Sequence, residues 1–112
     1  MNRLFIALML LIFFTGCRKN CLEHNSECLQ TKIDEFKSKL ICTEGASIKE
    51  YTFQCVTVYV FDQSRCMADG WADIWDENCN FLGMLGGIAG FSKINDVDFY
   101  DHAKYKRTIW HN

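Results

Sequence analysis

The chain has 112 residues, seven cysteines, no proline and a net charge of −2. This length allows one small domain, and an acidic balance without a basic stripe argues against a nucleic-acid-binding protein. The sequence lacks the closely spaced cysteine pairs of a zinc site and the Lys–Ser/Thr pair of a nucleotide loop, so we expect no cofactor.

The N-terminus has the layout of a secretion signal. The basic Arg3 precedes an unbroken apolar run from Leu4 to Phe14. This run of about 11 residues matches the apolar region of a signal peptide. It is shorter than the roughly 20 residues that a membrane-spanning helix needs. We therefore predict a signal peptide and not a membrane span.

Cys17 follows two small residues, Thr15 and Gly16, directly after the apolar run. This order is typical of bacterial lipoproteins, in which a peptidase cuts before the cysteine and a diacylglyceryl group is attached to its sulfur. Several acyl chains on one residue anchor a protein stably, whereas a single chain binds weakly. We predict a lipoprotein signal peptide over residues 1–16 and a lipid anchor at Cys17 in the membrane of a bacterial cell envelope. The domain would then lie on the periplasmic or surface-exposed side.

A lipid on Cys17 leaves an even number of cysteines, and an even number in an oxidising compartment predicts disulfide bonds. The six are Cys21, Cys28, Cys42, Cys55, Cys66 and Cys79. Many connectivities are open to six cysteines, and we favour a bond between Cys66 and Cys79. It would close a loop of about a dozen residues and stabilise the fold by about 3 kcal/mol.

The mature chain begins with a polar tether over residues 17–26, and one small domain follows over residues 27–112. The domain opens with an amphipathic helix, predicted over residues 27–41, whose apolar residues recur every three or four positions. These residues are Leu29, Ile33, Phe36 and Leu40. A helix of this length holds its ends about 21 Å apart, which excludes a bond between Cys28 and Cys42.

Four strands are predicted next from β-branched and aromatic residues. They cover residues 48–53, 56–61, 71–75 and 81–85. Gln54 and Cys55 read as a two-residue hairpin turn. The apolar residues beyond position 90 are expected to cover the sheet edge. The predicted fold is α+β, with one N-terminal amphipathic helix packed on a small, disulfide-stapled antiparallel β-meander.

Most of the mature chain resembles a family of small bacterial lipoproteins whose domain has no assigned function. The shared features, in order, are Tyr51-x-Phe53-Gln54, Val58-Tyr59-Val60-Phe61-Asp62, Cys66 with Asp69, Asp76-x-x-Cys79-Asn80, Leu85-Gly86-Gly87-Ile88-x-Gly90, Ile94-Asn95 and Ile109-Trp110. Family members carry glycine at the position of Cys55, as a two-residue turn prefers. The resemblance implies an envelope lipoprotein and supplies no catalytic residues.

Strand alternation places Trp71, Asp73 and Trp75 on one face of the third predicted strand. Carboxylates beside aromatic rings are used by glycosidases, and Asp69 or Asp73 is a candidate for such chemistry. Asp76 lies three residues after Asp73, however, and an odd separation on a regular strand points two side chains to opposite faces. A solvated acidic face is the favoured interpretation. The tryptophans form either a binding face or, as is more common, part of the core.

The glycine-rich segment after the fourth strand is a candidate ligand-facing loop. Its residues are Gly86, Gly87 and Gly90, with Asn95 beyond them. The glycines indicate a turn with positive φ angles and not a phosphate-binding loop.

We expect a non-enzymatic module that binds another envelope component, either a protein or a glycan. The alternatives are an inhibitor or modulator of an envelope or foreign hydrolase, and a small hydrolase that uses Asp69 or Asp73. Small size, the predicted disulfides and the lack of a convincing nucleophile–base pair favour the binding module.

Overall fold

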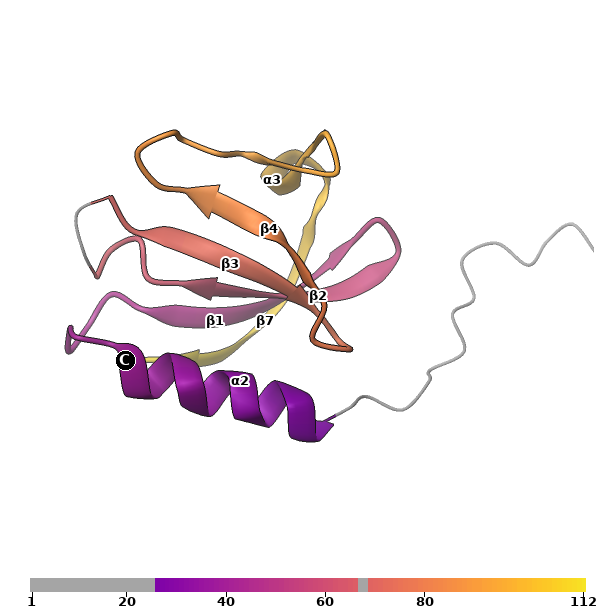
Figure 1. The fold of residues 1–112 in the computed structure, drawn as a ribbon. Coiled ribbons are helices and arrows are strands. Elements are labelled where there is room, and N and C mark those ends of the chain that lie inside the picture. The colour runs from indigo at the N-terminus through magenta and orange to yellow at the C-terminus, as the bar shows by residue number, and fades with distance from the viewer. Residues whose placement is uncertain (1–25, 67–68) are drawn as a thin grey trace, which may run out of the picture.

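The computed structural model describes residues 26–66 and 69–112. The elements follow in the order α2 (Ser26–Lys39), β1 (Ser47–Phe53), β2 (Val56–Asp62), β3 (Trp71–Asp76), β4 (Phe81–Gly86), β5 (Lys93–Ile94), β6 (Val97–Asp98), α3 (Phe99–His102) and β7 (Lys104–His111) (Figure 1). The predicted signal peptide, Cys17 and the tether up to residue 25 lie outside the described residues. Within the described ranges, no helix has the length and apolar character of a membrane span.

The main sheet has five antiparallel strands in the order β4-β3-β2-β1-β7, and β5 pairs with β6 separately. Phe53 faces Val56 across the first hairpin, so Gln54 and Cys55 form its turn. Their φ angles are 51° and 61°, as the type I′ turn between right-twisted strands requires. The four predicted strands, the helix and this turn are confirmed.

Strand β7 differs from the sequence prediction. Residues 104–111 were expected to cover the sheet edge, but they extend the sheet by pairing with the free side of β1. Six of the eight β7 residues are exposed, and only Ile109 and Trp110 are half-buried. An edge strand with so little burial lacks the alternation that identifies strands, which is why its sequence did not reveal it. The sheet is therefore a four-stranded meander with a fifth strand added at β1.

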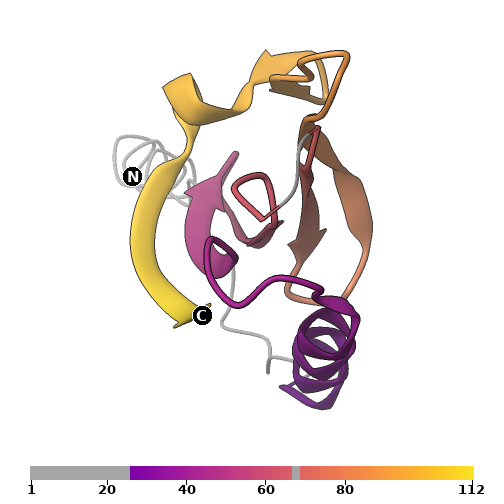
Figure 2. The same ribbon diagram turned by 90° about the vertical axis from the view of Figure 1, so that its left-hand side faces the viewer.

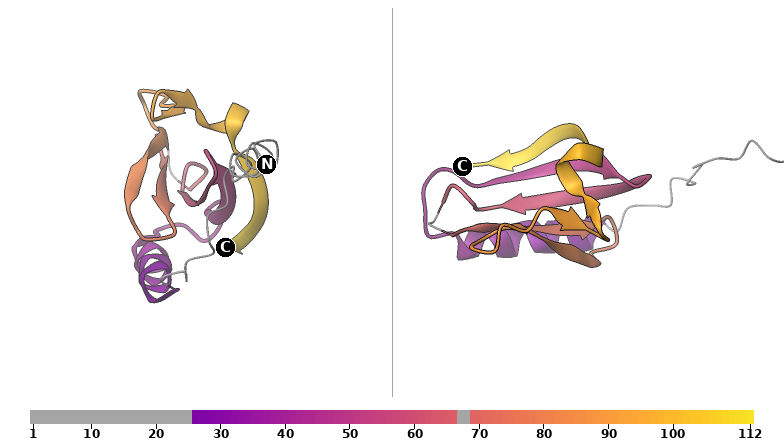
Figure 3. Two further views of the ribbon diagram at one scale, coloured as in Figure 1. Left: turned by 90° about the vertical axis from the view of Figure 1, so that its right-hand side faces the viewer. Right: turned by 90° about the horizontal axis from the view of Figure 1, so that it is seen from above.

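Both faces of the sheet are covered. Helix α2 lies on one side and runs roughly along the strands, while β5, β6 and α3 lie on the other (Figures 1, 2 and 3). On the α2 side, the buried cluster consists of Ile33, Ile48, Tyr59 and Phe61. On the opposite side, it consists of Phe53, Val58, Val60, Ala72, Ile74, Leu85, Ile94 and Phe99. The apolar run in β2 follows from this arrangement, because its alternate side chains enter different clusters.

Two disulfides join described residues, Cys28 with Cys79 and Cys42 with Cys66, with Cα–Cα distances of 6.2 and 5.6 Å. The favoured bond between Cys66 and Cys79 is therefore wrong. These two cysteines flank opposite ends of β3, and a strand of this length holds them about 20 Å apart. Cys55 is also disulfide-bonded. Its partner lies outside the described residues, as does Cys21.

Candidate functional site

A groove of about 320 Å³ runs between α2 and the face of the sheet on which α2 packs. It is lined by Lys32, Glu35, Phe36, Lys39, Phe61, Gln63, Trp71, Asp73 and Trp75. The four helical residues recur at intervals of three, one and three, so they form one stripe along α2. Helix and strand thus form two walls of one open site.

Strand β3 supplies Trp71, Asp73 and Trp75 on a single face, as the alternation predicted. Trp71 is 39% exposed. Trp75 is half-buried, and its ring lies 5.1 Å from the ring of Phe81 on the neighbouring strand. Trp110 packs against Phe36 at 6.1 Å and does not line the groove. The three tryptophans therefore divide between core packing and an accessible surface, with Trp71 the most accessible.

Asp73 lies half-buried between the two tryptophans of β3. Burial raises the pKa of its carboxyl group above the usual 3.8, because a charge loses its hydration there. A hydrogen bond from the Trp71 side chain opposes this rise in pKa. The Asp73 carboxyl group thus lines the groove beside the indole ring of Trp71.

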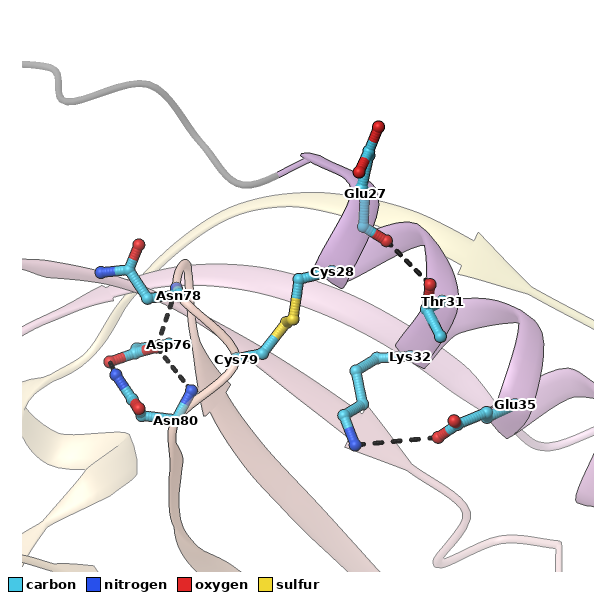
Figure 4. Close-up of a disulfide and its surroundings, with 9 residues drawn as sticks. All are labelled: Glu27, Cys28, Thr31, Lys32, Glu35, Asp76, Asn78, Cys79 and Asn80. Carbon is cyan, nitrogen blue, oxygen red and sulfur yellow. Dashed lines mark hydrogen bonds and ion pairs between the residues drawn. A yellow bond between two sulfur atoms is a disulfide. The ribbon is translucent and has the colours of Figure 1, made fainter.

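On the helical wall, Lys32 contacts both Glu35 and Trp75. Its Nζ lies 3.7 Å from Oε2 of Glu35 (Figure 4) and 4.3 Å from the centre of the Trp75 ring. The ammonium group therefore covers one face of Trp75 through a cation–π contact. Lys39, one helical turn beyond Glu35, gives the groove a second cation.

The disulfides tie both ends of the helical wall to segments next to β3. Cys28, in the first turn of α2, bonds Cys79 in the turn after β3 (Figure 4). Cys42, just beyond α2, bonds Cys66 in the loop before β3. Each end of the helix is thereby covalently tied to a segment flanking one end of the same strand. The spacing between α2 and β3 is fixed by covalent bonds as well as by packing.

The other two acidic candidates, Asp69 and Asp76, do not lie in the groove with Asp73. Asp76 organises the β3–β4 turn, where its Oδ1 accepts hydrogen bonds from the backbone amides of Asn78 and Asn80, both at 2.8 Å (Figure 4). Asp69 belongs to the loop before β3 and has a φ of 60°. Neither residue lines the groove. The structure brings Asp73 together with Trp71 and Trp75, as the alternation predicted, and leaves Asp69 and Asp76 outside the groove.

The glycine-rich segment forms a turn. Gly86, Gly87 and Gly90 have φ angles of 79°, 74° and 65°, which confirms the structural interpretation. Gly86 and Gly90 also line a second hollow of about 280 Å³, together with Tyr100. Asn95 lies instead on the β5–β6 turn and donates a 3.4 Å hydrogen bond to Gln54. The four residues proposed as one loop site therefore do not form one site.

The helical wall of the groove leaves no distinctive signal in the sequence. Lys32, Glu35 and Lys39 lie beside the apolar stripe of α2 and look like an ordinary solvated helix face. Only the packing of Phe36 against Phe61, with ring centres 5.4 Å apart, shows which side of α2 faces the groove. That contact joins distant parts of the chain and leaves no local pattern.

The described residues form a small, mostly β domain in which a helix and a five-stranded antiparallel sheet, joined by two disulfides, flank an open groove of mixed polarity. The chain belongs to the family described as domain of unknown function (DUF6970), whose model matches residues 34–112. The expected relation to a family with an uncharacterised domain is confirmed. Comparison with the curated proteins and with the solved structures gives no significant match.

Proposed function

We propose that the protein is a lipid-anchored component of a bacterial cell envelope and that its domain is a non-enzymatic binding module. The lipid on Cys17 holds it at the membrane, and the groove between α2 and β3 takes the ligand. The ligand is an envelope protein or a glycan. The predicted signal peptide, with Thr15, Gly16 and Cys17 directly after its apolar run, supports the envelope location, and the groove supports the binding role.

The observation that carries the binding role is the position of the two described disulfides. Both join the helical wall to segments that flank the strand wall. A domain of this size needs covalent cross-links for stability, but cross-links elsewhere would serve that need equally well. At these positions they also fix the shape of the groove before a ligand arrives. A pre-organised site loses less entropy on binding, which raises affinity.

Site-specific crosslinking in living cells tests the proposal. Met84 is 37% exposed and faces Asp73 across the β3–β4 pair, so a photoreactive residue there reports on the groove. Tyr105, 56% exposed on β7, is the control. We expect one discrete adduct from position 84 and none from position 105. Equal labelling at both positions, or none at either, contradicts a binding module.

The alternative is an inhibitor or modulator of an envelope or foreign hydrolase. The observation that favours it is Ile88, which is 86% exposed in the turn after β4. An inhibitor presents such a side chain on a rigid loop to the pocket of its target. A third photoreactive position at Ile88 separates the two functions, because an adduct with a hydrolase from position 88 alone favours inhibition. A small hydrolase acting through Asp73 is the least supported role.

A further inference from the structure

The ligand chemistry can be read from the groove if the proposed binding function holds. Trp71 presents a broad apolar side chain that is 39% exposed, next to the half-buried carboxyl group of Asp73 on the same face of β3. An accessible indole ring is a flat surface on which an apolar face of a ligand can stack.

The polar groups that line the groove include both hydrogen-bond donors and acceptors. Asp73 accepts hydrogen bonds, Lys39 donates them, and the amide of Gln63 does both. Hydroxyl groups can satisfy such a mixture, since each one donates and accepts. The groove thus combines an apolar platform with partners for a polyhydroxylated ligand.

The charges of the groove cancel. Its lining holds two lysines, Lys32 and Lys39, and two acids, Glu35 and Asp73, so the formal sum is zero. A site for a polyanion such as nucleic acid would carry excess positive charge. Charge complementarity therefore favours a neutral ligand.

The groove is also elongated. Trp71 and Trp75 are four residues apart on one strand, which places them about 13 Å from each other along the floor. The disulfides hold the helical wall along this length. The groove thus has an exposed tryptophan ring, mixed hydrogen-bonding groups, no net charge and an elongated shape. We infer that it binds a neutral oligosaccharide of pyranose sugars, with one ring stacked on Trp71.

Calorimetry with the full-length oxidised chain tests this inference, with a β-linked N-acetylglucosamine oligomer and a β-linked glucose oligomer as probes. We expect saturable binding of at least one oligomer. Trp71→Ala should weaken it about tenfold or more, as expected for an aromatic anchor. Trp71→Phe keeps an aromatic ring and should retain most of the affinity. Tyr105→Ala, outside the groove, should leave the affinity unchanged.

The nuclear magnetic resonance signal of the Trp71 indole N–H gives a second readout. This signal is identified by its loss in Trp71→Phe, and it should shift when the oligomer is added. Preference for N-acetylglucosamine indicates a cell-wall-type glycan, whereas preference for glucose indicates a plain polysaccharide, and either result supports the inference. Binding that survives Trp71→Ala overturns it. No binding of either oligomer, with a protein adduct still formed at position 84, overturns the glycan ligand and leaves the binding function intact.

Discussion

At the scale of single residues, the charge of Asp73 lowers the stability of the folded protein at neutral pH. A carboxyl group with a raised pKa resists the ionised state that it must adopt at neutral pH. A fold selected only for stability would place a neutral residue there. Such a cost is common at binding sites, where a polar group is kept for a ligand and not for the fold.

Replacing Asp73 with asparagine should therefore stabilise the protein modestly at pH 7. Because the folded pKa lies above 3.8, the contribution of Asp73 to stability is most favourable below that pH. It declines as the pH rises through the interval up to the raised folded value, and the penalty then stays constant. Asparagine removes the penalty because it carries no charge, and it has nearly the same shape as aspartate. Urea unfolding of Asp73→Asn and wild type, each at pH 3 to 7, measures the difference.

The matched control for that experiment is Asp34→Asn, because Asp34 is exposed on α2 and does not line the groove. The control should not reproduce the gain in stability at pH 7. A lower stability of Asp73→Asn at pH 7 would show that the carboxylate stabilises the fold, and it would remove the argument that this residue is kept for a ligand.

At the scale of elements, local periodicity predicted most of the fold. The spacing of Leu29, Ile33 and Phe36 identified α2, and the apolar run of β2 identified a strand. The disulfide partners could not be derived in the same way, because Cys66 and Cys79 are near neighbours in sequence but lie at opposite ends of β3. Pairing depends on how α2 lies across the sheet, and that is a long-range property. For the same reason, only one wall of the groove could be predicted from the sequence. The residues of the strand wall follow from the alternation of side chains along β3, whereas the position of the helical wall depends on long-range packing.

Removing one disulfide should cost both stability and groove geometry. The bond between Cys42 and Cys66 has a sequence separation of 24 residues, and loop entropy predicts a loss of about 3 kcal/mol for Cys42→Ser/Cys66→Ser. The bond between Cys28 and Cys79 has a separation of 51 residues and predicts about 4 kcal/mol. Urea unfolding of the two double variants measures these losses.

Iodide quenching of tryptophan fluorescence supplies the second measurement on the same variants. Each should be quenched more than wild type, because Trp75 becomes accessible when one end of α2 is released. Unchanged unfolding and quenching in both variants would mean that packing alone positions α2 on the sheet.

At the scale of the whole molecule, the proposed lipid anchor precedes the helix that forms one wall of the groove. Helix α2 begins at Ser26, and Cys28 is tied to the β3–β4 turn. Under the proposed anchoring, the lipid at Cys17 precedes that end by only a short stretch of chain. The proposed anchor would thus be joined to the end of α2 that the bond between Cys28 and Cys79 holds.

The lipid anchor gives the last prediction. In Cys17→Ser the peptidase has no modified cysteine to recognise, so residues 1–16 should remain attached and no fatty acid should be incorporated. Labelling with palmitate and intact mass measure both effects in the host membrane fraction. Asn20→Ser, just beyond the predicted lipobox, is the control and should be processed and labelled like wild type. Palmitate incorporation into Cys17→Ser, or a wild-type mass that includes the leader, would contradict the anchor and with it the address in the envelope.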